Sequence, residues 1–192
     1  MKYFPAVALI SATLATGSAF AAPVKYNIDN LHAWVNFKVL HLGFAQATGT
    51  MGKVNGTIMF DKDSPAASTV NAQIDIKGIH TGFDKRDAWI ASDKVLNAGK
   101  NPAITFTSKQ ITVTGKNKGS ITGDLTINGV SKPITMQVTF NRIGTNPLTK
   151  KETIGFSASA QFKRSDYGVK AFVGPLGDLV SVEIELEAVR AN

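Results

Sequence analysis

Three histidines, His32, His41 and His80, are the side chains best suited to bind a metal or move a proton at neutral pH. His32 and His41 flank a stretch with strand-like alternation, and their odd spacing places them on opposite faces of such a strand. The chain has no cysteine, which excludes thiolate metal sites, iron–sulfur clusters, disulfides and thiol catalysis. We therefore expect no metal site, and local hydrogen bonding for the histidines.

Charged residues gather in three short segments that could carry chemistry. Segment 61–64 begins like a calcium loop, but Ala66 and Ala72 stand where that loop needs Gly and Glu. Segment 84–87 (Asp-Lys-Arg-Asp) fits either a polar cluster at a barrel mouth or the charged start of a helix. Segment 164–168 (Arg-Ser-Asp-Tyr-Gly) fits either a structural turn or a polar site at a strand end. No nucleophile elbow, zinc-protease helix or phosphate loop is present in the sequence, so no catalytic residue is predicted.

The formal net charge is +7, from 21 basic and 14 acidic residues. The lysines are spread along the chain, without a dense basic stretch interleaved with aromatics, so we expect no nucleic-acid partner. The charge instead favours solubility or loose peripheral contact with anionic membrane lipids. The sequence leaves open whether the chain forms a homodimer.

β-strands must position these residues. Apolar and polar side chains alternate with a period of two in several stretches, separated by turn signals at 61–65, 115–119 and 128–129. Only 84–97 is helical in character, as one or two short turns. The pattern predicts an all-β fold of about eight antiparallel strands, either a sandwich or a closed barrel. The expected strands are 24–29, 35–40, 53–60, 70–77, 103–113, 119–127, 134–141, 156–163 and 180–189.

Small residues occupy several expected inward positions, including Ala33, Ala72, Ala158 and Ala160. They either leave room for a cavity or match bulky neighbours across a packed core. Alternation alone does not decide between these arrangements.

Residues 1–21 have the pattern of a secretory signal peptide. Lys2 precedes an apolar run, and Ala19-Phe20-Ala21 forms a small-x-small cleavage site. The apolar run is too short for a membrane span of ~20 residues. We predict removal of residues 1–21 and export of the domain 22–192 to the periplasm.

An ordered set of short motifs resembles the YceI family of secreted bacterial lipocalin-like proteins. The resemblance implies an extended eight-stranded antiparallel barrel with one or two short helices. It also implies a cavity for long amphiphilic lipids, such as polyprenyl chains or isoprenoid quinones. The motifs are 26–29, His32, 35–39, 41–43, 56–61, 79–82, 86–87, 101–108, 123–133, 154–156 and 164–168.

Two positions depart from the family pattern. Ala33 stands where the family usually has Ser after the first His. The family's Arg-Asp-x-His-Leu is replaced by Arg86-Asp87-Ala88-Trp89-Ile90, so a large apolar side chain takes the place of a polar one near the implied cavity.

The leading hypothesis is therefore a periplasmic, non-enzymatic binding protein for a long isoprenoid-type lipid, with no other cofactor. One alternative is a ligand-free, stress-related or membrane-surface protein with a filled barrel. Another is an enzyme acting on a cavity lipid, which would need a nucleophile, metal or cofactor that the sequence does not display. The predicted site comprises lining residues Phe37, Val39, Phe106, Met136, Val138, Phe156 and Phe162, capping residues Trp89 and Ile90, and head-group contacts His41, Arg86 and Arg164.

Overall fold

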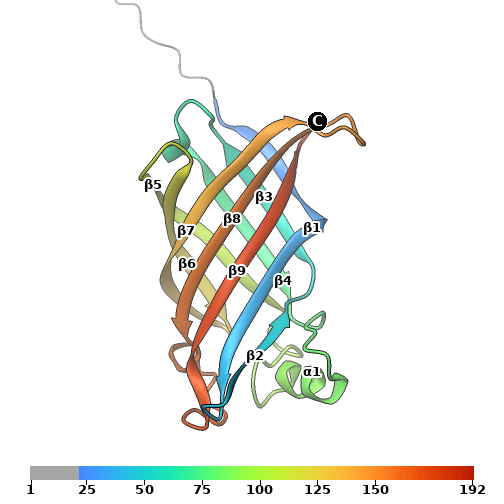
Figure 1. Ribbon diagram of the computed structural model, residues 1–192, viewed down its shortest axis with the longest axis vertical. Helices are drawn as coiled ribbons and strands as arrows, with labels where there is room; N and C mark the ends of the chain where they lie inside the picture. Colours follow the sequence, from blue (N-terminus) through green and yellow to red (C-terminus); the bar gives the residue numbers. More distant parts are fainter. Residues whose placement is uncertain (1–21) are drawn as a thin grey trace, which may run out of the picture.

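A closed antiparallel β-barrel with one α-helix at one end forms the molecule (Figure 1). The computed structural model describes residues 22–192, so the signal-peptide prediction for 1–21 lies outside the described residues. The predicted fold class is confirmed. The elements are β1 (Val24–His41), β2 (Ala45–Thr50), β3 (Val54–Phe60), η1 (Pro65–Ala67), β4 (Thr69–Asp75), α1 (Asp84–Ala91), β5 (Ala103–Val113), β6 (Lys118–Ile127), β7 (Val130–Thr145), β8 (Glu152–Lys163), η2 (Arg164–Tyr167) and β9 (Leu176–Arg190).

Strand β1 closes the barrel. It pairs with β9 on one side; on the other it pairs with β3 near its start and with β2 near its end. Because β2 and β3 share one position in the wall, nine strands make an eight-stranded barrel. The sequence predicted two strands where β1 is continuous, because a register shift between Ile28 and Ala33 interrupts the alternation. It missed β2, whose sequence Ala-Gln-Ala-Thr-Gly-Thr lacks large apolar residues.

The two faces of each strand divide between interior and solvent as the alternation predicts. On β9, Val180, Val182 and Ile184 line the interior. Glu183 lies outside, where its carboxylate pairs with the Lys38 ammonium at 2.8 Å. The period of two thus fixes which side chains face the barrel interior.

Aromatic residues fill part of the interior at the end where β1 begins. Tyr26 and Phe60 are buried there, with Phe140 and Phe156 packed against them. The Tyr26 hydroxyl donates to Glu152 Oε1 at 2.6 Å. Burial, reinforced by this carboxylate, raises the pKa of Tyr26 to about 12.

The opposite end carries α1 and η2. Helix α1 ends at Ala91, earlier than the predicted 84–97, and Ser92 Oγ donates to the Trp89 carbonyl at 2.6 Å. The following residues form turns, which bring Val95 into a second buried cluster with Tyr167. Within residues 22–192, no helix is long and apolar enough to cross a membrane.

Candidate functional site

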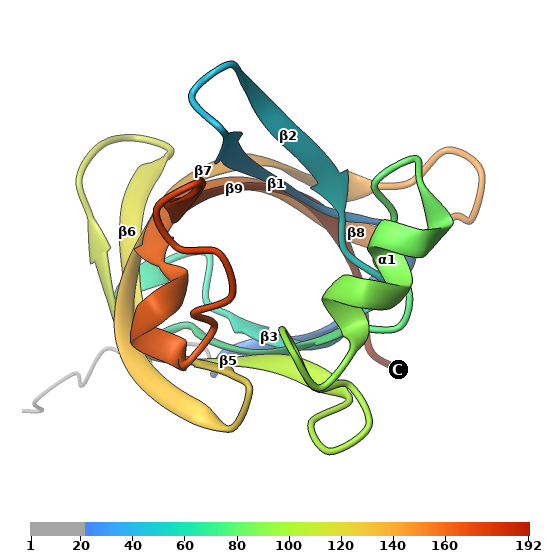
Figure 2. The same ribbon diagram turned by 90° about the horizontal axis from the view of Figure 1, so that it is seen from below.

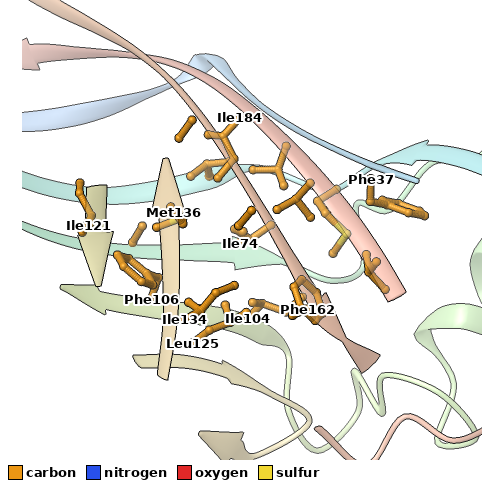
Figure 3. Close-up of a pocket in the computed structure, with 18 of the residues that line it drawn as sticks. Phe37, Ile74, Ile104, Phe106, Ile121, Leu125, Ile134, Met136, Phe162 and Ile184 are labelled. Atoms are coloured by element: carbon orange, nitrogen blue, oxygen red, sulfur yellow. The ribbon is translucent and has the colours of Figure 1, made fainter. Parts of the chain in front are cut away.

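The barrel encloses an elongated cavity of about 670 Å³. Its wall receives side chains from all nine strands, from α1 and from the loop after η2. Figure 3 shows apolar side chains, among them Phe37, Ile74, Phe106, Met136 and Ile184, around this space. The volume falls within the ~300–1,000 Å³ that is typical of small-molecule sites. The interior is therefore not filled by its own side chains.

The structure brings all twelve residues of the predicted site to the wall of this one cavity. Alternation explains the strand residues, because each lies at an inward position of its strand. Their role as ligand contacts stays a prediction. The twelve are Phe37, Val39, His41, Arg86, Trp89, Ile90, Phe106, Met136, Val138, Phe156, Phe162 and Arg164.

Sequence reasoning missed two groups of lining residues. The first group comprises further inward aliphatic side chains, such as Ile74, Ile134 and Ile184, which the same alternation could have identified. The second group is basic: Lys62 follows β3, Lys116 lies in the β5–β6 hairpin, and Lys118 begins β6. No sequence signal marks these lysines, because only the closed barrel brings the two turns to one end.

Every charged side chain that reaches the described cavity wall is basic. Lys62, Lys116 and Lys118 lie at the end where β1 begins, and Arg86 and Arg164 lie at the α1 end. Among residues 22–192, no Asp or Glu lines the cavity. An apolar middle with basic ends suits a long apolar ligand with a polar or anionic terminus.

A polar cluster surrounds Arg86 at the α1 end. Its guanidinium donates to Thr81 Oγ1 at 2.8 Å and to the Thr81 carbonyl at 2.6 Å. Asp87 Oδ1 accepts from the Thr81 backbone N–H at 2.9 Å, and Asp87 Oδ2 lies 3.5 Å from His80 Nδ1. Segment 84–87 therefore fits both interpretations made from the sequence: it begins α1, and it forms part of a polar cluster beside the cavity.

Arg164 is buried, and its guanidinium donates hydrogen bonds to four backbone carbonyls. An arginine has five N–H donors. Burial lowers the pKa of Arg164, and no carboxylate forms an ion pair with it among the described residues. This geometry assigns Arg164 to holding the loop after η2. The four acceptors are the carbonyls of Gly177 (2.8 Å), Ala171 (2.8 Å), Val169 (3.2 Å) and Leu176 (3.2 Å).

The histidines lie apart, as their spacing predicts. His41 reaches the cavity wall, whereas His32 is exposed and its Nδ1 lies 2.8 Å from Asp29 Oδ2. The hydrogen bond that the Asp29 carboxylate accepts from His32 raises the pKa of His32 and lowers that of Asp29. Across residues 22–192, no three His, Asp or Glu side chains converge in a way that could hold a metal ion.

The cavity reaches the surface at the α1 end, where Phe172 both lines it and is exposed to solvent. This mouth lies at the barrel end that carries α1, the loop after η2 and the β1–β2 hairpin (Figure 2). Trp89 reaches the cavity from α1, and Phe172 reaches it from the loop. Their rings are in contact. The Trp that departs from the family pattern therefore lies at the mouth, where a cap was predicted.

A family model, the YceI-like domain, matches residues 26–188. The chain is 37% identical over 180 residues to Protein YceI of Escherichia coli, covering 94% of this chain and 93% of that protein. The structure of the Campylobacter jejuni YCEI protein is similar, with a TM-score of 0.71 and 27% identity over 96% of this chain and 100% of that one. A polyisoprenoid binding domain from Saccharophagus degradans has a TM-score of 0.69 over 88% of this chain and 99% of its own; at 16% identity, that likeness shows the fold alone.

Proposed function

Since the chain belongs to the YceI family, we propose that it binds one long amphiphilic lipid of the isoprenoid class inside its barrel. The observation that carries this proposal is the apolar cavity of about 670 Å³ with basic residues at both ends. An apolar chain gains ~0.8 kcal/mol for each CH₂ group that leaves water. The cavity offers a wall for that chain along every strand, and its ends offer cations to a polar terminus.

The fold supports the same assignment. A polyisoprenoid binding domain in Saccharophagus degradans has this barrel. The N-terminal sequence supports action in the periplasm, where a free isoprenoid chain would need shielding from water. In this proposal the protein carries or holds the lipid and performs no catalysis.

Phe37→Arg tests the proposal, because it places a charge on the cavity wall. Asn36→Arg is the matched control, since the neighbouring residue faces the other side of β1. We expect Phe37→Arg to lose stoichiometric binding of an added isoprenoid quinone, and Asn36→Arg to keep it. Equal binding by both variants, with both folded by circular dichroism, would contradict the proposal.

A further inference from the structure

Four large apolar side chains are exposed on two loop tips beside the cavity mouth. Leu42 and Phe44 are 51% and 89% exposed in the β1–β2 hairpin, and Phe172 and Val173 are 64% and 40% exposed in the loop after η2. The Leu42 N–H donates to the Pro175 carbonyl at 2.9 Å, so the two tips lie side by side. We call Leu42, Phe44, Phe172 and Val173 the apolar rim. Exposed apolar clusters of this kind mark interaction surfaces.

Two rim residues, Leu42 and Phe172, also adopt a backbone conformation that bulky side chains disfavour. Leu42 has φ 53° and Gly43 has φ 76°, and the Phe44 N–H donates to the His41 carbonyl at 3.0 Å. A hairpin turn with two positive φ values favours Asn-Gly, and a bulky apolar residue at the first position is costly. Phe172 also has a positive φ, 53°. Side chains that are unfavourable in both exposure and backbone conformation indicate a functional demand at these positions.

The charges of the two tips suit a membrane surface. Segments 41–45 and 168–175 contain no Asp or Glu, and the second segment carries Lys170. A phospholipid surface with anionic head groups repels carboxylates and attracts lysines. Aromatic and aliphatic side chains are the ones that enter the boundary between head groups and acyl chains.

The rim is continuous with the interior. Phe172 belongs to the rim and also lines the cavity. Leu40 on β1 and Leu176 on β9 lie next to the rim in sequence and line the cavity as well. Figure 2 shows both tips at the edge of the same barrel end. A lipid that passes between a bilayer and the cavity would keep its chain against apolar surface throughout, rather than crossing water.

We propose that the apolar rim inserts into the surface of a lipid bilayer, so that the cavity mouth opens onto the acyl chains. The transfer of a lipid through this contact rests on the proposed function; the docking itself does not. The partner is the bilayer surface, and one contact face serves both adhesion and exchange.

Vesicle binding by the chain beginning at Ala22, which contains the whole described barrel, tests the docking. The vesicles contain equal parts of phosphatidylethanolamine and phosphatidylglycerol. The test variant is Leu42→Asn/Phe44→Ser, in which Asn suits the positive φ and neither residue lines the cavity. We expect the vesicle affinity to fall by about tenfold or more. Leu148→Asn is the control, because Leu148 is 88% exposed in the β7–β8 hairpin at the opposite end.

Weaker vesicle binding by Leu42→Asn/Phe44→Ser, with unchanged binding by Leu148→Asn, supports docking through the rim. An equal loss of binding in both variants would overturn it. Phe44→Trp gives a second readout: we expect its emission to shift to the blue on vesicles and to be quenched by brominated acyl chains. Wild-type protein that stays free of vesicles overturns the docking. So does a dimer in solution that the double variant dissociates, since the rim would then be a contact between two copies.

Separate loading with an isoprenoid quinone in detergent distinguishes the two proposals. If the protein binds vesicles but takes up no quinone, the proposed function is contradicted and the docking stands. If it takes up quinone but does not bind vesicles, the docking is contradicted and the proposed function stands.

Discussion

The indole of Trp89 on α1 and the ring of Phe172 in the loop after η2 have centroids 5.7 Å apart and planes inclined by 33°. The contact joins two segments that are remote in sequence and that frame the cavity mouth. Trp89 is half-buried and Phe172 is 64% exposed, so the pair lies at the boundary between cavity and solvent. We therefore propose that this pair gates the passage of a long ligand at the α1 end.

Replacing Trp89 with Ala should therefore speed ligand exchange. Aromatic pairs contribute about 0.5–1.5 kcal/mol beyond the area they bury. We expect the dissociation rate of a fluorescent polyene lipid, measured by stopped flow, to rise by up to roughly tenfold. Trp34→Ala is the control, because Trp34 is 50% exposed on the outside of the barrel. A rise in the control and none in Trp89→Ala would refute the gate.

Filling the cavity should expel the ligand. Ala158 faces the cavity from β8, whereas the adjacent Ser159 is exposed. We expect Ala158→Phe to lower the bound-lipid stoichiometry at least severalfold without a large loss of stability, because the new ring enters existing space. Ser159→Phe adds the same ring outside and should leave binding unchanged. Full occupancy in Ala158→Phe, measured by native mass spectrometry, would show that the ligand does not occupy this part of the barrel.

We expect Arg164 to stabilise the fold rather than to contact the ligand. Arg164→Met leaves four backbone carbonyls without their donor. We expect the free energy of unfolding in urea to fall by about 3 kcal/mol, since bonds to charged groups are worth ~1.5–3 kcal/mol each and are partly replaced by water. Arg164→Lys should also destabilise, because a single ammonium cannot reproduce the planar fork. If Arg164→Met kept wild-type stability but lost ligand, Arg164 would instead contact the head group.

Tyr26 should make stability fall at alkaline pH. Its pKa is raised in the folded state from 10.0 to about 12, so folding favours the protonated phenol. This contribution is complete below the unfolded pKa of 10.0 and is lost as pH rises towards about 12. We expect Tyr26→Phe to lower the unfolding free energy by about 1 kcal/mol at neutral pH, through loss of the bond to Glu152.

The same variant should show a shallower decline in unfolding free energy between pH 10 and 12 than the wild type. It should still decline somewhat, because the pKa of Tyr167 is also raised by burial. Urea titrations over this range measure the difference. Parallel pH profiles for the two proteins would contradict the assignment to Tyr26.

Much of the barrel wall was predictable from the sequence, because a period of two is a local property of each strand. Phe37, Met136 and Phe162 could be assigned to the interior before their partners were known, and all three line the cavity. The predicted turn at Asn128-Gly129 is confirmed, since both residues have positive φ values. Strand β2 was not predicted, because it lacks large apolar side chains and is a strand through its pairing with β1.

The ends of the cavity were less predictable, because they depend on contacts between distant loops. Arg164 was predicted as a head-group contact, yet its guanidinium is held by carbonyls that only the folded loop supplies. Lys62 and Lys116 carry no motif, and the closed barrel alone brings them to the cavity. Alternation allowed a cavity as well as a filled core; the resemblance implied the cavity, and the structure contains it.

Native mass spectrometry of the protein purified from the periplasm without detergent tests the central claim most directly. We predict a stoichiometric non-covalent adduct that solvent extraction identifies as an isoprenoid lipid, and that Phe37→Arg lacks. A clean mass of the bare chain, unchanged after incubation with isoprenoid quinones and polyprenyl phosphates, would contradict lipid binding in this barrel.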